Sequence, residues 1–275
     1  MDSILLTIPE DEYHNATREG KYLSSHMMID FMRDPLMYKQ KMDGTIVQEE
    51  TASMTIGRAT HTLVLEGKGK FLGEYTVSDG LINPKTGEFF GKATKAYKDW
   101  LAVQPLPIVS TNEFALMQNI QRSVWTHKEA EAILNNGYAE KVIRFDIDGE
   151  PCQARYDWID LDRGIVADLK TCENLDTFSR DAIKYGYIEQ MAFYRKGAKA
   201  HGKLINNVFL IAVEKTAPYR CGVFAIAHAA LDLAEEKIIA AVGNLKKCRE
   251  TNIFPTYFEE IRTLDYPAYI YGNNN

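Results

Sequence analysis

The sequence is poor in cysteine, and its cysteines show neither metal-binding nor disulfide spacing. Only four occur among 275 residues, and no Cys-x-x-Cys pair is present. Scattered cysteines argue against a structural zinc site and against a disulfide framework. We therefore expect reduced thiols, most of them packed in the interior: Cys152, Cys172, Cys221 and Cys248.

Long apolar runs are missing as well. No stretch approaches the length that spans a bilayer, so we expect no membrane partner. The opening segment, Met1–Leu6, carries the acidic Asp2 and no basic residue. That is not the pattern of a secretion signal, and a cytoplasmic location is therefore expected.

Low-complexity sequence is limited to the last four residues, and no internal repeat or composition break marks a second domain. An apolar content of 45% suits one sizeable globular domain over residues 1–275. Within it we expect a mostly helical part to about residue 135, an α/β core over about 136–251, and a C-terminal tail over 252–275.

Hydrophobic periodicity predicts the fold class. Helical spacing recurs in four segments: 92–103, 112–134, 177–201 and 230–251. Strand-like runs occur in five others: 140–147, 152–160, 164–170, 207–214 and 220–226. This order predicts an α/β fold in which helices flank a mixed central β-sheet, with an additional N-terminal helical region.

The most informative residues lie on two consecutive predicted strands. Asp157 closes one apolar run, and eleven residues later comes the triplet Asp168-Leu169-Lys170. Because side chains alternate along a strand, Asp168 and Lys170 share one face, while Ala167 and Leu169 point the other way. If the two runs pair as a hairpin, both carboxylates and the ammonium converge on one small volume.

Two carboxylates beside an ammonium suit magnesium-dependent phosphodiester hydrolysis. Magnesium takes oxygen ligands and usually combines one or two protein carboxylates with several waters. It can polarise a phosphoryl oxygen and lower the pKa of a bound water. Lys170 could orient or deprotonate that water, and the carbonyl of Leu169 is a candidate further ligand. Taken alone, an Asp-x-Lys triplet is more often a solvated face with a same-side ion pair.

Two other segments contain residue types that such a site uses. His61 lies in a predicted helix over 57–67, and Gln190 and Tyr194 stand four residues apart, on one face of another helix. Each of these residues alone is more often an ordinary structural residue. Only their combination with the two aspartates and the lysine points to a site.

In combination, these motifs resemble the PD-(D/E)xK nuclease superfamily. The pattern is Gly-x-x-x-His, then Asp, then Asp-x-Lys eleven residues on, then Gln-x-x-x-Tyr. It is similar in particular to the RecB-type nuclease domains and the RecE-type phage recombination exonucleases. The family's leading Pro-Asp is represented here by Tyr156-Asp157.

Two N-terminal blocks extend the resemblance to roughly residues 10–250. The block 22–38 combines a serine-capped helix with a Pro-x-x-Tyr turn, and the block 57–66 carries Gly-x-x-x-His-x-x-x-Leu-Glu. Ser24 or Ser25 suits the N-cap of a helix over Met27–Met32, and Pro35 ends that helix and can begin another.

The resemblance implies a role for each site residue. His61 would bind the metal or hold a ligand or water, and Asp157 and Asp168 would bind the metal. Lys170 would serve the attacking water. The implied cofactor is Mg²⁺, with Mn²⁺ able to substitute. No iron–sulfur cluster is expected, because relatives with one need a cysteine group near the C-terminus, where only Cys248 stands.

The resemblance also implies an activity and partners. Gln190 would position Lys170 or the DNA backbone, and Tyr194 would support the site. The chain would be a metal-dependent exodeoxyribonuclease acting from ends of double-stranded DNA, 5′ to 3′, in phage-type recombination. A ring-shaped homo-oligomer and a single-strand annealing partner protein would accompany it. Two alternatives stay open, an endonuclease of the same superfamily and a catalytically silent DNA-binding module.

A formal net charge of −6 is unusual for a DNA enzyme, because phosphate neutralisation normally drives affinity. Either local basic patches line a channel while the outer surface is acidic, or binding is weak unless the protein encloses its substrate, and we favour the first. The candidate basic residues are Arg58, Lys92, Lys95, Lys98, Arg155 and Lys184. Ser24, Ser25 and Arg58 suit a pocket for a terminal 5′-phosphate, or simply a helix cap and a surface arginine. Glu66 and Glu140 could each supply a carboxylate to a second metal ion, or could simply face solvent.

Overall fold

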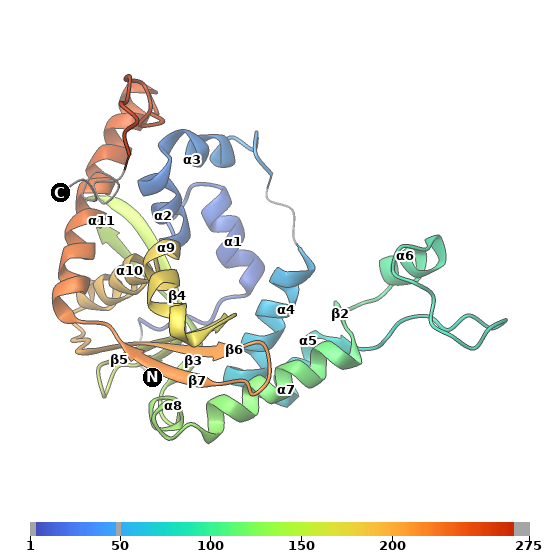
Figure 1. The fold of residues 1–275 in the computed structure, drawn as a ribbon. Coiled ribbons are helices and arrows are strands. Elements are labelled where there is room, and N and C mark those ends of the chain that lie inside the picture. The colour runs from blue at the N-terminus through green and yellow to red at the C-terminus, as the bar shows by residue number, and fades with distance from the viewer. Residues whose placement is uncertain (1–3, 48–50, 267–275) are drawn as a thin grey trace, which may run out of the picture.

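A five-stranded mixed β-sheet lies at the centre of the computed structural model, which describes residues 4–47 and 51–266 (Figure 1). Its strands are β3 (Tyr138–Ile147), β4 (Glu150–Asp160), β5 (Ile165–Cys172), β6 (Asn207–Glu214) and β7 (Cys221–Ala225). They lie side by side in chain order, and only β5 and β6 run parallel. The predicted mixed sheet is confirmed.

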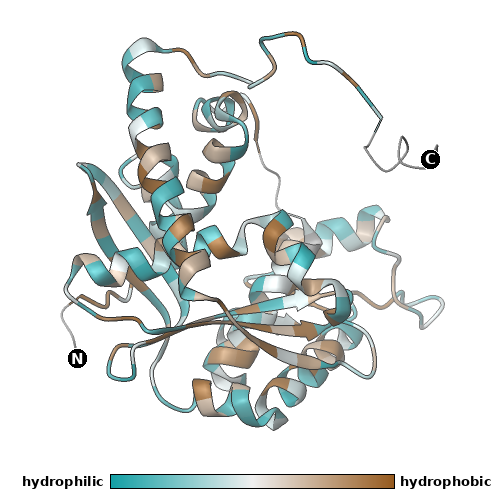
Figure 2. Ribbon diagram, turned by 60° about the vertical axis from the view of Figure 1, so that its left-hand side comes forward, coloured by the Kyte–Doolittle hydropathy of each residue, from teal (hydrophilic) through white to brown (hydrophobic). Residues whose placement is uncertain are grey.

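Helices cover both faces of this sheet. One face packs against α2 (Ser25–Arg33), α10 (Tyr187–Ala200) and α11 (His228–Thr251). The other packs against α7 (Thr111–Thr126), α8 (Lys128–Leu134) and a short π-helical segment, η1 (Thr62–Glu66). Figure 2 shows hydrophobic residues gathered along the central strands between these layers. The predicted α/β fold class is therefore confirmed.

Two predicted helices are each broken in two. The segment predicted as one helix over 177–201 follows a short 3-10 turn, η2 (Leu175–Thr177), and forms two helices, α9 (Phe178–Tyr185) and α10, which are separated by Gly186 at φ +74°. A glycine adopts this left-handed conformation at little cost and so ends a helix readily. The segment predicted over 112–134 is interrupted at His127, whose ring caps α8 by accepting from the Ala130 amide.

The N-terminal part is helical, as predicted. Its helices are α1 (Glu10–Arg18), α2, α3 (Pro35–Met42), α4 (Ala52–His61), α5 (Lys68–Glu74) and α6 (Lys95–Ala102). The amide of Met27 donates to the Oγ of Ser24, which confirms Ser24 as the N-cap of α2. Pro35 occupies the first position of α3, where its missing N–H costs nothing.

Two very short parallel strands, β1 (Thr76–Val77) and β2 (Ile108–Val109), were not expected from the sequence. The chain between them, including α6, extends away from the sheet as an arm in Figure 1. The predicted helix 92–103 is shorter than expected because Thr94 caps it.

After α11 the described chain, residues 252–266, contains no helix or strand. The rest of the predicted tail, 267–275, lies outside the described residues, as do residues 1–3 and 48–50. None of the described helices combines the length and apolar character that crossing a bilayer requires.

Candidate active site

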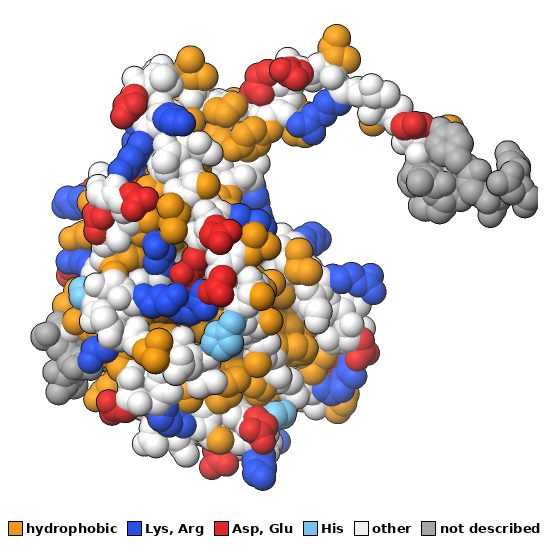
Figure 3. Space-filling model, turned by 90° about the vertical axis from the view of Figure 1, so that its left-hand side faces the viewer, with side chains coloured by type: hydrophobic (Ala, Val, Ile, Leu, Met, Phe, Trp, Pro, Cys, Tyr) orange, Lys and Arg blue, Asp and Glu red, His pale blue; other side chains and the backbone are white. Residues whose placement is uncertain are grey.

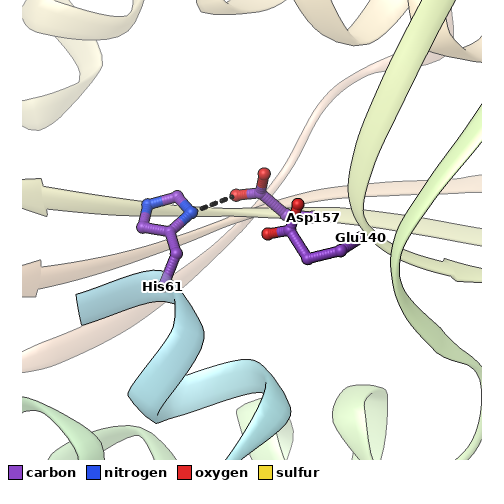
Figure 4. Close-up of side chains that lie close together, drawn as sticks. All are labelled: His61, Glu140 and Asp157. Carbon is purple, nitrogen blue, oxygen red and sulfur yellow. Dashed lines mark ion pairs between the residues drawn. The ribbon is translucent and has the colours of Figure 1, made fainter. Parts of the chain in front are cut away.

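His61 and Asp157, 96 positions apart in the predicted pattern, are in direct contact. The Nδ1 of His61 lies 3.1 Å from the Oδ2 of Asp157 (Figure 4). His61 is the last residue of α4, and the wider π-helical turn of η1 follows it at once. Such π-turns occur preferentially at functional sites, because they re-aim side chains of the helix.

Three carboxylates form a row across three adjacent strands. The register of β4 and β5 pairs Trp158 with Ala167, so the next position places Asp157 opposite Asp168. The register of β3 and β4 places Glu140 opposite Asp157 in the same way. Asp157 and Asp168 thus lie on neighbouring strands, just beyond the last paired residues of β4 and β5, and Glu140 lies on the other side of Asp157.

The sheet is distorted where Glu140 and Asp157 face each other. Glu140 has φ +53°, a left-handed conformation that is rare for a residue with a Cβ atom. Along β4, Tyr156 packs into the core beneath α10, whereas Trp158 packs into the core of the opposite face. The strands thus change face at this pair, which turns both carboxylates toward His61 (Figure 4).

Where β4 and β5 separate, the side chain of Asp157 takes the place of a backbone carbonyl as hydrogen-bond acceptor. The amide of Leu169 donates to the Oδ2 of Asp157 at 2.9 Å. Beyond this point the paired register between the two strands ends. The Leu169 amide thus stays hydrogen-bonded although it has no backbone partner on β4.

The second half of the site consists of Asp168, Lys170 and two residues of α10. Lys170 Nζ lies 2.5 Å from Asp168 Oδ2 and donates to Gln190 Oε1 at 3.1 Å. Gln190 Nε2 donates to Asp168 Oδ1 at 3.1 Å and to the hydroxyl of Tyr194 at 2.9 Å. All four side chains therefore form one connected network, with the ring of Tyr187 4.6 Å from Lys170 Nζ.

His61 and Asp157 stabilise each other's charged forms. Burial lowers the pKa of His61, but the charge of Asp157 and the hydrogen bond to it outweigh burial and raise that pKa to about 9. Burial raises the pKa of Asp157, and the charges of His61 and Lys170 bring it below its usual value. Each charge therefore favours the other in this shielded place, and a metal ion bound by His61 would replace the proton on the imidazole.

The other carboxylates are crowded. Burial and the charge of Asp157 raise the pKa of Asp168 to about 6, although Lys170 opposes this. Burial and the charge of Asp157 likewise raise the pKa of Glu140 to about 7, against Arg155. Burial lowers the pKa of Lys170, but Asp168 and Asp157 hold it above its usual value.

This donor set fits a hard divalent cation. His61, Glu140 and Asp157 each offer one ligand atom, and these atoms lie within 4.8 Å of one another. A bound dication would offset the repulsion between the carboxylates of Glu140 and Asp157, which raises the pKa of Glu140 in addition to burial. Asp168 lies outside this group of three and is held by Lys170 and Gln190 instead.

Glu140 is the residue that sequence reasoning left undecided between a metal and solvent. Its side chain is 16% exposed and belongs to the acidic group. No spacing signal could identify it, because the direction of its side chain depends on the left-handed backbone at that residue.

The residues considered for a 5′-phosphate pocket have other contacts in the structure. Ser24 caps α2, and Arg58 lies 3.4 Å from the Oε1 of Glu10.

The six candidate basic residues do not form one surface. Arg155 is paired with Glu140, Lys92 lies 3.9 Å from Glu113, and Lys95 and Lys98 belong to α6 of the arm. On the face of the molecule drawn in Figure 3, acidic and basic side chains are intermixed, with no extended positive area.

A mixed sheet with acidic residues and a lysine on adjacent strands is the arrangement found in nucleases of the PD-(D/E)xK type. Residues 24–267 match the family described as a PDDEXK-like domain of unknown function (DUF3799), and the chain belongs to this family. The superfamily predicted from the motifs is thus confirmed. No curated protein matches the sequence.

One of the solved structures found by comparison shares the fold at low sequence identity, and others match with lower scores. A crystal structure of an exonuclease candidate from Eubacterium rectale matches with a TM-score of 0.66 and 14% identity, covering 97% of this chain and 98% of the other. A phage-related exonuclease from Haemophilus somnus 129PT matches with a TM-score of 0.38 and 12% identity, covering 84% and 96%. An alkaline exonuclease from Laribacter hongkongensis gives a TM-score of 0.33 and 15% identity, covering 88% and 95%.

Proposed function

We propose that the protein is a metal-dependent deoxyribonuclease that hydrolyses phosphodiester bonds from the ends of double-stranded DNA, in the 5′ to 3′ direction, in phage-type recombination. The observation that carries this proposal is the placement of Asp157 opposite Asp168, with Lys170 on the same strand as Asp168 and 2.5 Å from it. Membership of the PDDEXK-like family supports the chemistry. The full-length likeness to the Eubacterium rectale exonuclease candidate agrees with action on DNA ends.

Each side chain has a role in this proposal. His61, Glu140 and Asp157 would hold the Mg²⁺, with Asp168 and the carbonyl of Leu169 completing its surroundings. A bound magnesium ion would supply Lewis-acid activation of the scissile phosphate and of the attacking water. Mn²⁺ would substitute, because it accepts the same carboxylate, carbonyl and water ligands.

The remaining residues act on the water and on one another. Lys170 Nζ would orient the attacking water and offset the negative charge that develops on the phosphate, and it would deprotonate that water only if a bound dication lowered the pKa of Lys170. Gln190 would fix Lys170 and Asp168 at once, because its amide group contacts both. Tyr194 supports Gln190 from behind, and the backbone carbonyl of Tyr194 in turn accepts from the hydroxyl of Tyr156 at 2.7 Å.

One assay tests the site. The wild type, Asp168→Ala and Lys170→Ala would be incubated with Mg²⁺ and linear duplex DNA, with Lys237→Ala, a half-exposed lysine on α11, as the matched control. We expect mononucleotide release by the wild type and the control alone. Equal release by all four proteins would contradict the assignment.

The substrate form and the labelled end test the finer parts. Covalently closed circular DNA should resist the enzyme, since it has no ends, and cutting of that substrate would indicate an endonuclease instead. Duplexes labelled at one 5′ or one 3′ terminus should lose the 5′ label first. Sedimentation in the presence of duplex DNA tests the ring-shaped homo-oligomer, and capture of a single-strand annealing protein tests the partner.

A further inference from the structure

Arg155 stands two residues before Asp157 on β4 and is bonded to the carboxylate of Glu140. The Nε of Arg155 lies 2.5 Å from the Oε2 of Glu140. Both side chains are largely shielded, with 22% of the arginine and 16% of the glutamate exposed. A charged hydrogen bond of this length and shielding fixes the direction of the carboxylate.

Glu140 needs such an anchor. Its backbone is left-handed, a conformation that costs free energy for any residue with a Cβ atom and that persists only when its surroundings impose it. Its carboxylate also lies near that of Asp157, in the group whose ligand atoms are within 4.8 Å of one another, so the two like charges repel. Without a cation beside it, this carboxylate would be pushed away from His61 and Asp157.

Folding stability alone does not explain an arginine at position 155. The Nη1 atom of Arg155 is buried and finds no hydrogen-bond partner among the described residues. A buried guanidinium with an unused donor costs desolvation that an apolar side chain would avoid. Such a cost is retained in proteins where a charged group orients functional side chains, as do the outer partners of metal ligands.

We propose that Arg155 is a positioning residue that holds Glu140 in the metal-binding arrangement with His61 and Asp157. The inference rests on the proposed function, because it assigns Glu140 to the metal. Arg155 contacts neither the DNA nor the ion in this proposal. It acts through Glu140, by fixing one carboxylate oxygen so that the other is presented to the ion.

Calorimetric titration with Mn²⁺, without DNA, tests this role independently of activity. Arg155→Met should weaken Mn²⁺ binding about 10- to 100-fold, the usual effect of losing an outer partner of a metal ligand. Arg155→Lys keeps the charge but lacks the planar guanidinium group, and it should recover only part of the affinity. With Glu140→Gln already present, Arg155→Met should cause little further loss, because both changes remove the same contribution.

Arg195→Met is the matched control. Arg195 is also a shielded arginine, with its Nε 2.5 Å from the Oε1 of Glu235, but this pair joins α10 to α11 and neither residue belongs to the acidic group. We expect Arg195→Met to lower the melting temperature and leave Mn²⁺ affinity unchanged. In DNA cleavage, Arg155→Met should raise the Mn²⁺ concentration for half-maximal rate about 10-fold or more, with a much smaller change in the rate at saturating metal.

The outcomes separate the two proposals. If the wild type binds Mn²⁺ and cleaves DNA while a folded Arg155→Met or Arg155→Lys binds Mn²⁺ as tightly, the role of Arg155 is wrong and the proposed function stands. An equal loss of affinity in Arg195→Met would also contradict the inference. If the wild type neither binds Mn²⁺ nor cleaves DNA, both proposals fail.

Discussion

The side-chain amide of Gln190 bridges the two charged groups of the Asp-x-Lys triplet, since its Oε1 accepts from Lys170 and its Nε2 donates to Asp168, each at 3.1 Å. Gln190 is almost fully buried on α10, so it has no alternative partners in water. An amide is suited to this place because it donates on one side and accepts on the other.

Replacing Gln190 should therefore reduce the rate of DNA cleavage by more than the loss of folding stability can explain. Gln190→Leu removes both contacts and frees Lys170 to move, which should lower the cleavage rate at saturating Mg²⁺ about 100-fold. Gln153→Leu is the control, because Gln153 is equally buried but bonds Tyr13 and Thr17 of α1. It should lower the melting temperature and leave the rate within a few-fold of wild type. A Gln190→Leu rate matching that of Gln153→Leu would contradict a positioning role.

The ion pair of Lys170 and Asp168 allows stability and activity to be separated. In EDTA, Lys170→Met leaves the carboxylate of Asp168 buried without its cation, which should lower the free energy of unfolding by about 3 kcal/mol. The double change Lys170→Met with Asp168→Asn removes the stranded charge and should restore most of that loss.

The rate of DNA cleavage should fall by roughly 10²- to 10⁴-fold in the single variant, and the double variant should not regain it. Urea unfolding in EDTA and nucleotide release in Mg²⁺ measure the two effects. If the double variant regained cleavage together with stability, Lys170 would have only a structural role.

The ring of Tyr187 should contribute to the placement of Lys170. The ammonium lies 4.6 Å from the ring centroid, within the range of a cation–π interaction, which contributes about 0.5–2 kcal/mol. Tyr187→Leu should therefore lower the cleavage rate by roughly 2- to 30-fold, and Tyr187→Phe, which keeps the ring face, should change it little. Steady-state rates at saturating DNA and Mg²⁺ check this. Equal losses in both variants would point to the hydroxyl rather than the ring.

Local rules were sufficient for the strand-borne part of the site. Alternation along β5 places Asp168 and Lys170 on one face, and a short turn necessarily brings the strand of Asp157 beside it. The contributions of His61 and Gln190 could not be derived in this way, since their helices reach the sheet only through tertiary packing. They came from the resemblance to known nucleases.

Glu140 shows what the sequence could not supply. In a regular strand its side chain would follow the alternation of its neighbours, and only the left-handed backbone at φ +53° turns it toward Asp157. The two helix breaks also differ in how far they can be predicted from the sequence. Gly186 is a recognisable stop signal, whereas the break at His127 depends on an imidazole acting as the cap of α8, a residue type rarely expected there.

A glycine inside α10 should be essential for packing this helix against the sheet. A Cβ atom at Gly197 would lie 2.7 Å from the hydroxyl of Tyr156 and 2.8 Å from the ring of Phe145, both in the core beneath the site. Gly197→Ala should lower the free energy of unfolding by about 1–3 kcal/mol through overpacking. Gly243→Ala on α11 meets nothing within 4 Å and should stabilise the protein by about 0.5–1 kcal/mol, because alanine favours a helix. Urea denaturation measures both, and destabilisation of equal size would show that packing at Gly197 is not the cause.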